Sequence, residues 1–167
     1  AMSRWGWAPI GFEEPLILLT AIHFHFAGLT APLVAGYVWR TASYADTKTS
    51  SNWTVWHAVT LFLVVGGIPL TALGITISQL GGSPWIERLA AWMLIAGMAF
   101  LSIALQRQVM VSKGPVMQRF LYLIAAGCLL VSMTAAAIFA SSGGATALGH
   151  ASLSLDDMRR WHGLVNV

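Results

Sequence analysis

The chain has few charged residues, and this scarcity is its clearest compositional feature. Only 9% of its 167 residues are charged, whereas 57% are hydrophobic. An average soluble domain has about 25% charged residues, so the composition excludes an ordinary water-soluble enzyme. The nine Lys and Arg residues outnumber the six Asp and Glu residues, but no stretch combines them with aromatic residues as a nucleic-acid-binding surface would require. We therefore expect the basic residues to lie at a membrane surface and expect no nucleic-acid partner.

Cysteine is also scarce, and alternating strand patterns are absent. Cys128 is the single cysteine, so no intrachain disulfide can form. It lies in an apolar run, where a free cysteine behaves as a small buried hydrophobic residue. The N-terminal residues lack the apolar stretch of a secretory signal peptide. Because only helices and closed barrels can cross lipid, the lack of alternation predicts helices.

Four apolar segments are long enough to cross a bilayer as helices. A helix rises 1.5 Å per residue, and the hydrocarbon core is about 30 Å thick. The segments comprise residues 15–39, 53–80, 85–106 and 118–142. Residues 156–167 then look like the start of a short or truncated fifth helix, with acidic residues in its first turn. The sequence therefore predicts an all-α polytopic membrane bundle in which residues 1–167 form a single domain.

Basic residues are unevenly distributed between the two sides of the predicted bundle. We call the side of the N-terminus side A and the opposite side side B. Side A carries more acidic than basic residues, whereas side B has one acidic residue, Asp46. The basic residues of side B are Arg40, Lys48, Arg107, Lys113 and Arg119. The positive-inside rule places side B in the cytoplasm, and we expect the protein in a bacterial inner membrane.

The second segment combines an internal proline with a stripe of small residues. Pro69 removes one backbone hydrogen bond and is expected to kink the helix. Small residues recur at helical spacing along one face, namely Gly67, Thr71, Gly74 and Ser78. Such residues allow membrane helices to approach closely. We expect this face to pack tightly against a neighbouring helix.

Two histidines lie in the first segment, and they are the most informative residues of the chain. Ionisable side chains inside a membrane are costly and usually functional. Successive residues of a regular helix are turned by about 100°, so His23 and His25 are expected to point in nearly opposite directions. They therefore cannot chelate one ion. Thr20 shares the face of His23, whereas Gly28 and Pro32 share the face of His25.

The beginning and the end of the chain are expected to meet near side A. After four crossings the fifth helix starts from side A, and His23 lies about 12 Å from that side. We therefore predict one polar pocket built from both ends of the chain, without a metal ligand. Its predicted catalytic residues are Glu13, Glu14, His23, His25 and His162. Its predicted substrate-binding residues are Thr20, Trp92, Arg160 and Asn166. Structural alternatives are helix capping by the glutamates, headgroup anchoring by Arg160 and lipid contact by Trp92.

Two short blocks resemble the YndJ-like bacterial membrane proteins. The first is Leu-Thr-Ala-Ile-His-Phe-His-Phe-Ala-Gly, residues 19–28, where that family has Tyr in place of Phe26. The second is His162-Gly163-x-x-Asn166, which resembles a His-Gly-x-x-Asn element. The resemblance implies one recurring unit that contains Thr20, His23, His25, His162 and Asn166. It also implies longer relatives with additional helices, but it names no reaction.

Three functional hypotheses fit these patterns, beside a purely structural role for the histidines. The leading one is an intramembrane acid–base enzyme, of isomerase or cyclase type, acting on a lipid-soluble isoprenoid- or polyketide-like substrate. Histidine suits this role because it titrates near neutrality, and the reaction requires no cofactor. The second is a b-type haem or metal protein, with His23 or His25 opposite His162. The third is a proton-coupled small-molecule transporter, which four or five helices would form best as a homo-oligomer. The expected partners are membrane lipids and a small lipophilic molecule.

Overall fold

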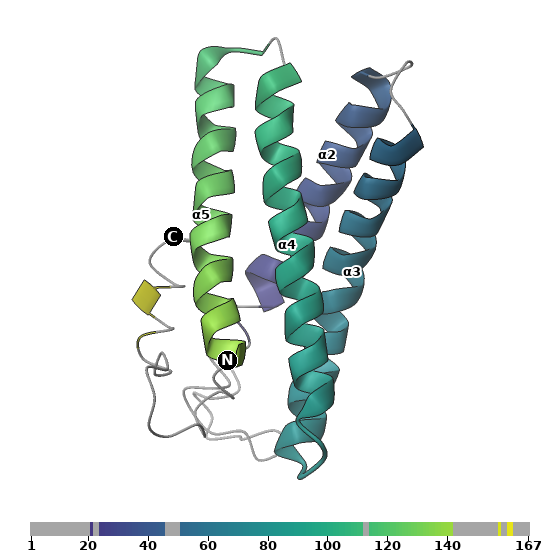
Figure 1. Cartoon of the computed structure of the whole chain (residues 1–167), viewed down its shortest axis with the longest axis vertical. Helices are drawn as coiled ribbons and strands as arrows, with labels where there is room; N and C mark the ends of the chain where they lie inside the picture. Colours follow the sequence, from purple (N-terminus) through teal and green to yellow (C-terminus); the bar gives the residue numbers. More distant parts are fainter. Residues whose placement is uncertain are drawn as a thin grey trace.

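The structure is a bundle of antiparallel helices. The computed structural model describes residue 21 and residues 24–45, 51–111, 114–141, 157, 160 and 161. These residues form the π-helix η3 (Phe26–Thr30) and the α-helices α2 (Ala31–Ala45), α3 (Ser51–Gln79), α4 (Trp85–Val111) and α5 (Val116–Ser141). No strand occurs in these ranges, and α2 to α5 run alternately up and down (Figure 1). The predicted all-α class is confirmed.

Three of the helices are long and apolar enough to cross a membrane. Their candidate spans are Trp53–Gln79, Trp85–Met110 and Val116–Ser141, close to the three segments predicted from the sequence. The predicted first crossing, residues 15–39, begins outside the described residues, so the count of four full crossings stays a prediction. Its C-terminal part lies in η3 and α2, and α2 continues beyond Trp39 to Ala45. Of the predicted fifth helix, residues 157, 160 and 161 are described, and they have helical backbone.

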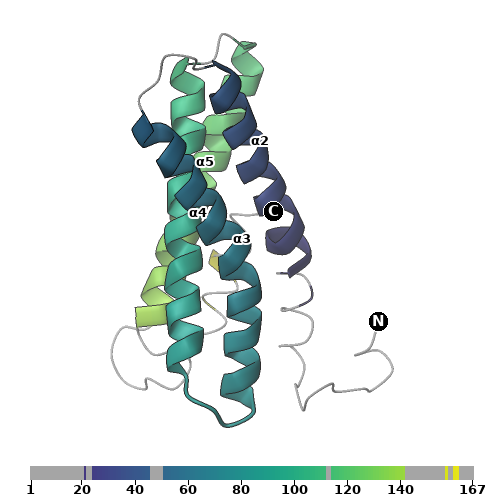
Figure 2. The ribbon, with the colours of Figure 1, turned by 90° about the vertical axis from the view of Figure 1, so that its right-hand side faces the viewer.

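α4 occupies the centre of the described bundle. It packs against α3 on one side and α5 on the other, whereas α2 packs mainly against α3 (Figures 1 and 2). In the most apolar window of α4, 39% is buried, compared with 11% for α5. α5 therefore exposes most of its apolar surface, as a lipid-facing helix does. The core comprises Ala31, Ala35, Val38, Val64, Ile68, Met98, Leu101, Ala104, Leu105 and Ala126.

Glycines hold α3 and α4 unusually close together. A Cβ atom on Gly74 would lie 2.6 Å from the Cα of Glu87, and one on Gly67 would lie 3.2 Å from the Cα of Leu94. On the α4 side, a Cβ on Gly97 would lie 2.9 Å from the Cβ of Leu63. The predicted stripe of small residues on α3 is therefore confirmed as a packing surface at Gly67 and Gly74. This close contact is what small residues provide in membrane bundles.

The turn between α3 and α4 ends the first of these helices with a glycine. Gly81 has φ +83°, a left-handed conformation that costs little without a Cβ. The Gly82 N–H donates to the Ile77 carbonyl at 2.8 Å, and the Gly81 N–H donates to the Ser78 carbonyl at 3.1 Å. This pair of bonds is a Schellman motif, which satisfies the last carbonyls of α3. We call this side of the bundle the A end, and the side with the α4–α5 connection the B end.

The π-helix η3 interrupts the regular helix that the sequence predicts through Pro32. Pro32 has no N–H and cannot donate to the carbonyl of Gly28, four residues earlier. A wider turn with i→i+5 hydrogen bonds directly precedes it, consistent with that missing donor. The predicted faces, which assumed about 100° per residue, do not hold across Phe26–Thr30. His25 stands immediately before this wide turn, and Gly28 lies next to α3, where a Cβ would be 3.7 Å from Ile68 Cγ2.

Candidate functional site

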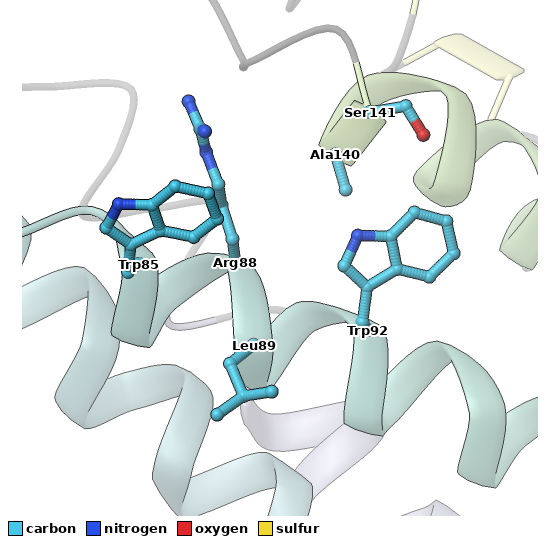
Figure 3. A pocket seen from close by; sticks show the side chains of 6 residues that line it. All are labelled: Trp85, Arg88, Leu89, Trp92, Ala140 and Ser141. Atoms are coloured by element: carbon cyan, nitrogen blue, oxygen red, sulfur yellow. The ribbon is translucent and has the colours of Figure 1, made fainter.

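An open pocket lies at the A end between the beginning of α4 and the end of α5. Its volume is about 380 Å³, within the range of pockets that hold small molecules. Figure 3 shows Trp85 and Arg88 side by side, with the ring of Trp92 below the last turn of α5. The lining residues are Trp85, Arg88, Leu89, Trp92, Ala140 and Ser141. The beginning of α4 and the end of α5, which are far apart in sequence, thus build one hollow.

The pocket offers apolar surface and a cation, but no acid–base group. Trp92 is 45% exposed and Leu89 is 67% exposed, so both present apolar surface to an occupant. The guanidinium carbon of Arg88 lies 5.4 Å from the ring centroid of Trp85, a cation–π contact. None of the six lining residues is a histidine or a carboxylate. The arrangement suits the binding of an amphiphile more directly than it suits proton transfer.

Most of the predicted site residues lie outside the described part of the chain. These are Glu13, Glu14, Thr20, His23, His162 and Asn166. Three predicted residues are described. Trp92 lines the pocket, whereas the side chains of His25 and Arg160 are exposed. Within the described ranges, no group of three His, Cys, Asp or Glu residues is placed to hold a metal ion.

A second group of polar and aromatic side chains lies at the B end, where α3 begins and α4 ends. The guanidinium carbon of Arg107 lies 3.4 Å from the ring centroid of Trp53, a close cation–π stack. The rings of Trp56 and Phe100 have centroids 4.3 Å apart, and those of Trp53 and His57 lie 6.3 Å apart. We call these five residues the B-end cluster. It joins the first turns of α3 to the last turns of α4.

The positions of Trp53 and Arg107 at the ends of two consecutive apolar segments are a sequence signal for the B-end cluster. Trp53 begins the second predicted segment, and Arg107 directly follows the third. Because these two segments run antiparallel through a short turn, both residues must return to the same membrane surface. Read alone, Trp53 looks like an interfacial tryptophan and Arg107 like a loop charge. Only the stacking of Arg107 on Trp53 marks the two residues as members of one cluster.

Polar links also connect α5 to its neighbours. The hydroxyl of Ser102, which is fully buried in α4, donates to the Ala126 carbonyl of α5 at 2.8 Å. Nearer the B end, Gln118 Nε2 donates to Tyr122 Oη at 2.9 Å. The Tyr122 phenol also interacts electrostatically with the phenol of Tyr37 on α2. The Ser102 bond links α5 to α4 and the contact of Tyr122 with Tyr37 links it to α2, although little of the surface of α5 is buried, whereas the Gln118 bond lies within α5.

Comparison with known proteins identifies a family but no characterised relative. No curated protein matches the chain, and no solved structure matches it. A family model described as YndJ-like protein matches residues 1–167, the whole chain. This agrees with the resemblance carried by the two histidine-containing blocks. The protein belongs to the YndJ-like family.

Proposed function

We propose that this protein binds a lipid-soluble amphiphile in the A-end pocket and catalyses an acid–base step on it, of isomerase or cyclase type. The observation that carries the proposal is the pocket between α4 and α5. It combines the apolar surfaces of Trp92 and Leu89 with the guanidinium group of Arg88. An isoprenoid- or polyketide-like molecule with an acidic or carbonyl head has the matching chemistry.

The position of the pocket suits a ligand that arrives from the bilayer. Trp92 and Leu89 lie within the candidate span Trp85–Met110, two turns or fewer from its A-end terminus. A tail can therefore remain at the depth of the hydrocarbon while the head reaches the interfacial Arg88. Arg88 is the natural partner for an oxyanion because its N–H groups bind carboxylates in a planar, bidentate manner. Trp85 stabilises that guanidinium through its ring face.

The proton-transfer groups in this proposal come from the histidine-containing blocks. His23, His25 and His162 would exchange the proton, with Glu13 or Glu14 as the carboxylate partner. Arg160 and Asn166 would hold the polar group of the substrate, next to Thr20. Two points support these roles. Imidazole titrates near neutrality, and the chain belongs to the YndJ-like family, whose sequences the two histidine-containing blocks resemble. The pocket residues would position the substrate and take no part in proton transfer.

Extraction of bound molecules tests the binding half of the proposal. The protein would be purified in detergent, extracted with organic solvent and analysed by mass spectrometry, beside Trp92→Ala and Phe62→Ala variants. Phe62 is the control because it is 68% exposed on α3 and does not line the pocket. Losing about 60 Å² of apolar contact costs about 1.5 kcal/mol, so Trp92→Ala should retain about tenfold less ligand. Equal retention by all three proteins would refute the pocket.

Isotope exchange tests the chemical half. The extracted amphiphile would be incubated in heavy water with the wild-type protein and with the His23→Ala and His162→Ala variants. An acid–base isomerase should introduce deuterium at carbon, and both variants should lose this exchange while keeping the helical circular dichroism spectrum. Exchange that is absent from the wild type, or unchanged in both variants, would eliminate the acid–base mechanism.

A further inference from the structure

The B-end cluster contains strong hydrogen-bond donors without acceptors in the described structure. Among the hydrogen bonds and ion pairs of the described residues, none involves Arg107. The Nε1–H group of Trp56 is buried and likewise has no acceptor there. A buried donor without a partner costs free energy comparable to a lost hydrogen bond. Arg107 and Trp56 are therefore the unsatisfied donors of the cluster in the described structure.

Among the described residues, the charge at this end of the bundle has one sign. The turns of α2, α3, α4 and α5 that form the B end contain Arg40, Arg107 and Arg119 but no Asp or Glu. Arg119 is already engaged, because its Nε donates to the Val109 carbonyl at 3.2 Å. Arg107 differs, because its guanidinium group stacks on Trp53. Stacking occupies the face of the guanidinium and leaves the N–H groups at its edge for a planar or tetrahedral oxyanion.

We propose that the B-end cluster is a phosphate-binding site, with Arg107 as its cation and the Trp56 indole N–H as a second donor. The half-buried His57, which lies within electrostatic range of Arg107, is the third polar group beside the anion. The cluster lies at the surface that the basic residues assign to the cytoplasm, where anionic phospholipids attract juxtamembrane cations. A phospholipid headgroup and a free phosphate share this chemistry.

Native mass spectrometry of the purified full chain tests the site. Delipidated protein in detergent would be titrated with phosphatidylglycerol and, in parallel, with phosphatidylcholine. Arg107→Gln should weaken phosphatidylglycerol binding about tenfold, since a charged hydrogen-bond pair is lost. Arg119→Gln is the matched control, because it removes the same charge from the same end but from a guanidinium that already has an acceptor. It should change the affinity less than about twofold.

Inorganic phosphate and a Trp56→Phe variant complete the test. The first distinguishes a lipid headgroup from free phosphate as the ligand, and the second is independent of Arg107. Inorganic phosphate that displaces the lipid would identify free phosphate as a ligand, whereas lipid binding that is insensitive to inorganic phosphate would identify the headgroup; both results support the site. Trp56→Phe keeps a ring against Phe100, removes the N–H and should weaken binding about threefold. This variant carries the test if Arg107→Gln does not fold. Equal affinity for wild type and the Arg107→Gln or Trp56→Phe variant would overturn the proposal, as would equal losses in both arginine variants.

Discussion

Adding one methyl group at Gly74 should separate two helices that now touch through their backbones. The new Cβ would lie 2.6 Å from the Cα of Glu87 and 2.8 Å from its nitrogen. Carbon atoms pack best at about 3.5–4.0 Å, so α3 and α4 would have to part by about 1 Å at this point. Overpacking of this kind costs about 1–3 kcal/mol. Gly74→Ala should therefore lower the free energy of unfolding even though alanine favours helix.

Gly97→Ala and Gly127→Ala are the matched comparisons for Gly74→Ala. Gly97 faces the backbone of Leu63 and Val64, where a Cβ would meet atoms at 3.0 Å or less, so it should behave as Gly74 does. Gly127 lies in α5, and a Cβ there meets nothing within 4 Å. Its substitution should leave stability unchanged or raise it by up to about 1 kcal/mol, because only the helix preference of alanine acts there. The contrast separates close packing from the general effect of glycine in a helix.

A thiol-reactive fluorescent dye can follow unfolding in detergent. Cys128 is the single cysteine and is half-buried in α5, so its labelling reports exposure of that helix. A destabilisation of about 2 kcal/mol should lower the midpoint temperature of Gly74→Ala by about 4–8 °C. The midpoint of Gly127→Ala should equal that of wild type or exceed it by up to about 4 °C. If Gly74→Ala and Gly97→Ala unfold at the wild-type temperature, the packing of α3 against α4 described above is incorrect.

Three further predictions concern the polar links and the orientation. Ser102→Ala removes a buried hydrogen bond to a carbonyl of α5 and should lower stability by about 0.6–1.5 kcal/mol in the same thermal assay; an unchanged midpoint would show that this bond contributes nothing. Tyr37→Phe, Tyr122→Phe and the double variant form a cycle whose coupling should be about 0.5–1 kcal/mol, and additive effects would mean that the phenols are independent. In a cysteine-free background, Leu80→Cys should react with an impermeant maleimide in intact cells and Val116→Cys only after permeabilisation, because the positive-inside rule predicts that the B end faces the cytoplasm; the reverse pattern would invert the topology.

The long helices were predictable because lipid leaves the backbone few alternatives. Residues that are apolar over more than 20 positions must satisfy their backbone groups internally, so α3, α4 and α5 follow from composition and from the turn at Gly81. The stripe with Gly67 and Gly74 was equally clear, because small residues at helical spacing have a physical use only where helices touch. What hydropathy does not specify is which helix is central. The central position depends on which helix faces meet, and α4 gives no clue because its apolar residues are spread around the whole helix.

The local irregularity and the sites were harder to predict for a different reason. The helix faces were predicted with the 100° rotation of a regular α-helix. A prediction of this kind cannot detect the wide turn before Pro32, where the rotation per residue is smaller. The sequence predicts Trp92 as a substrate-binding residue; Trp92 lines the A-end pocket, and its binding of a substrate stays a prediction. Its partners Arg88 and Ser141 come from helix ends, which ordinarily anchor in the interface. A pairing such as Arg107 on Trp53 depends on the relative height of two helices, a property of the folded bundle.

The wide turn at Phe26–Thr30 also makes the chain tolerant of a change in length at one place. An i→i+5 turn holds one residue more than an i→i+4 turn. Deleting a single residue there would let the segment close as ordinary α-helix and leave His25 at nearly the same angle around the axis, because the turn would lose only its additional residue. The same deletion within α2, which holds no additional residue, would turn every preceding residue by about 100°. The direction of His25 is thus protected against a one-residue deletion inside the wide turn but not beside it.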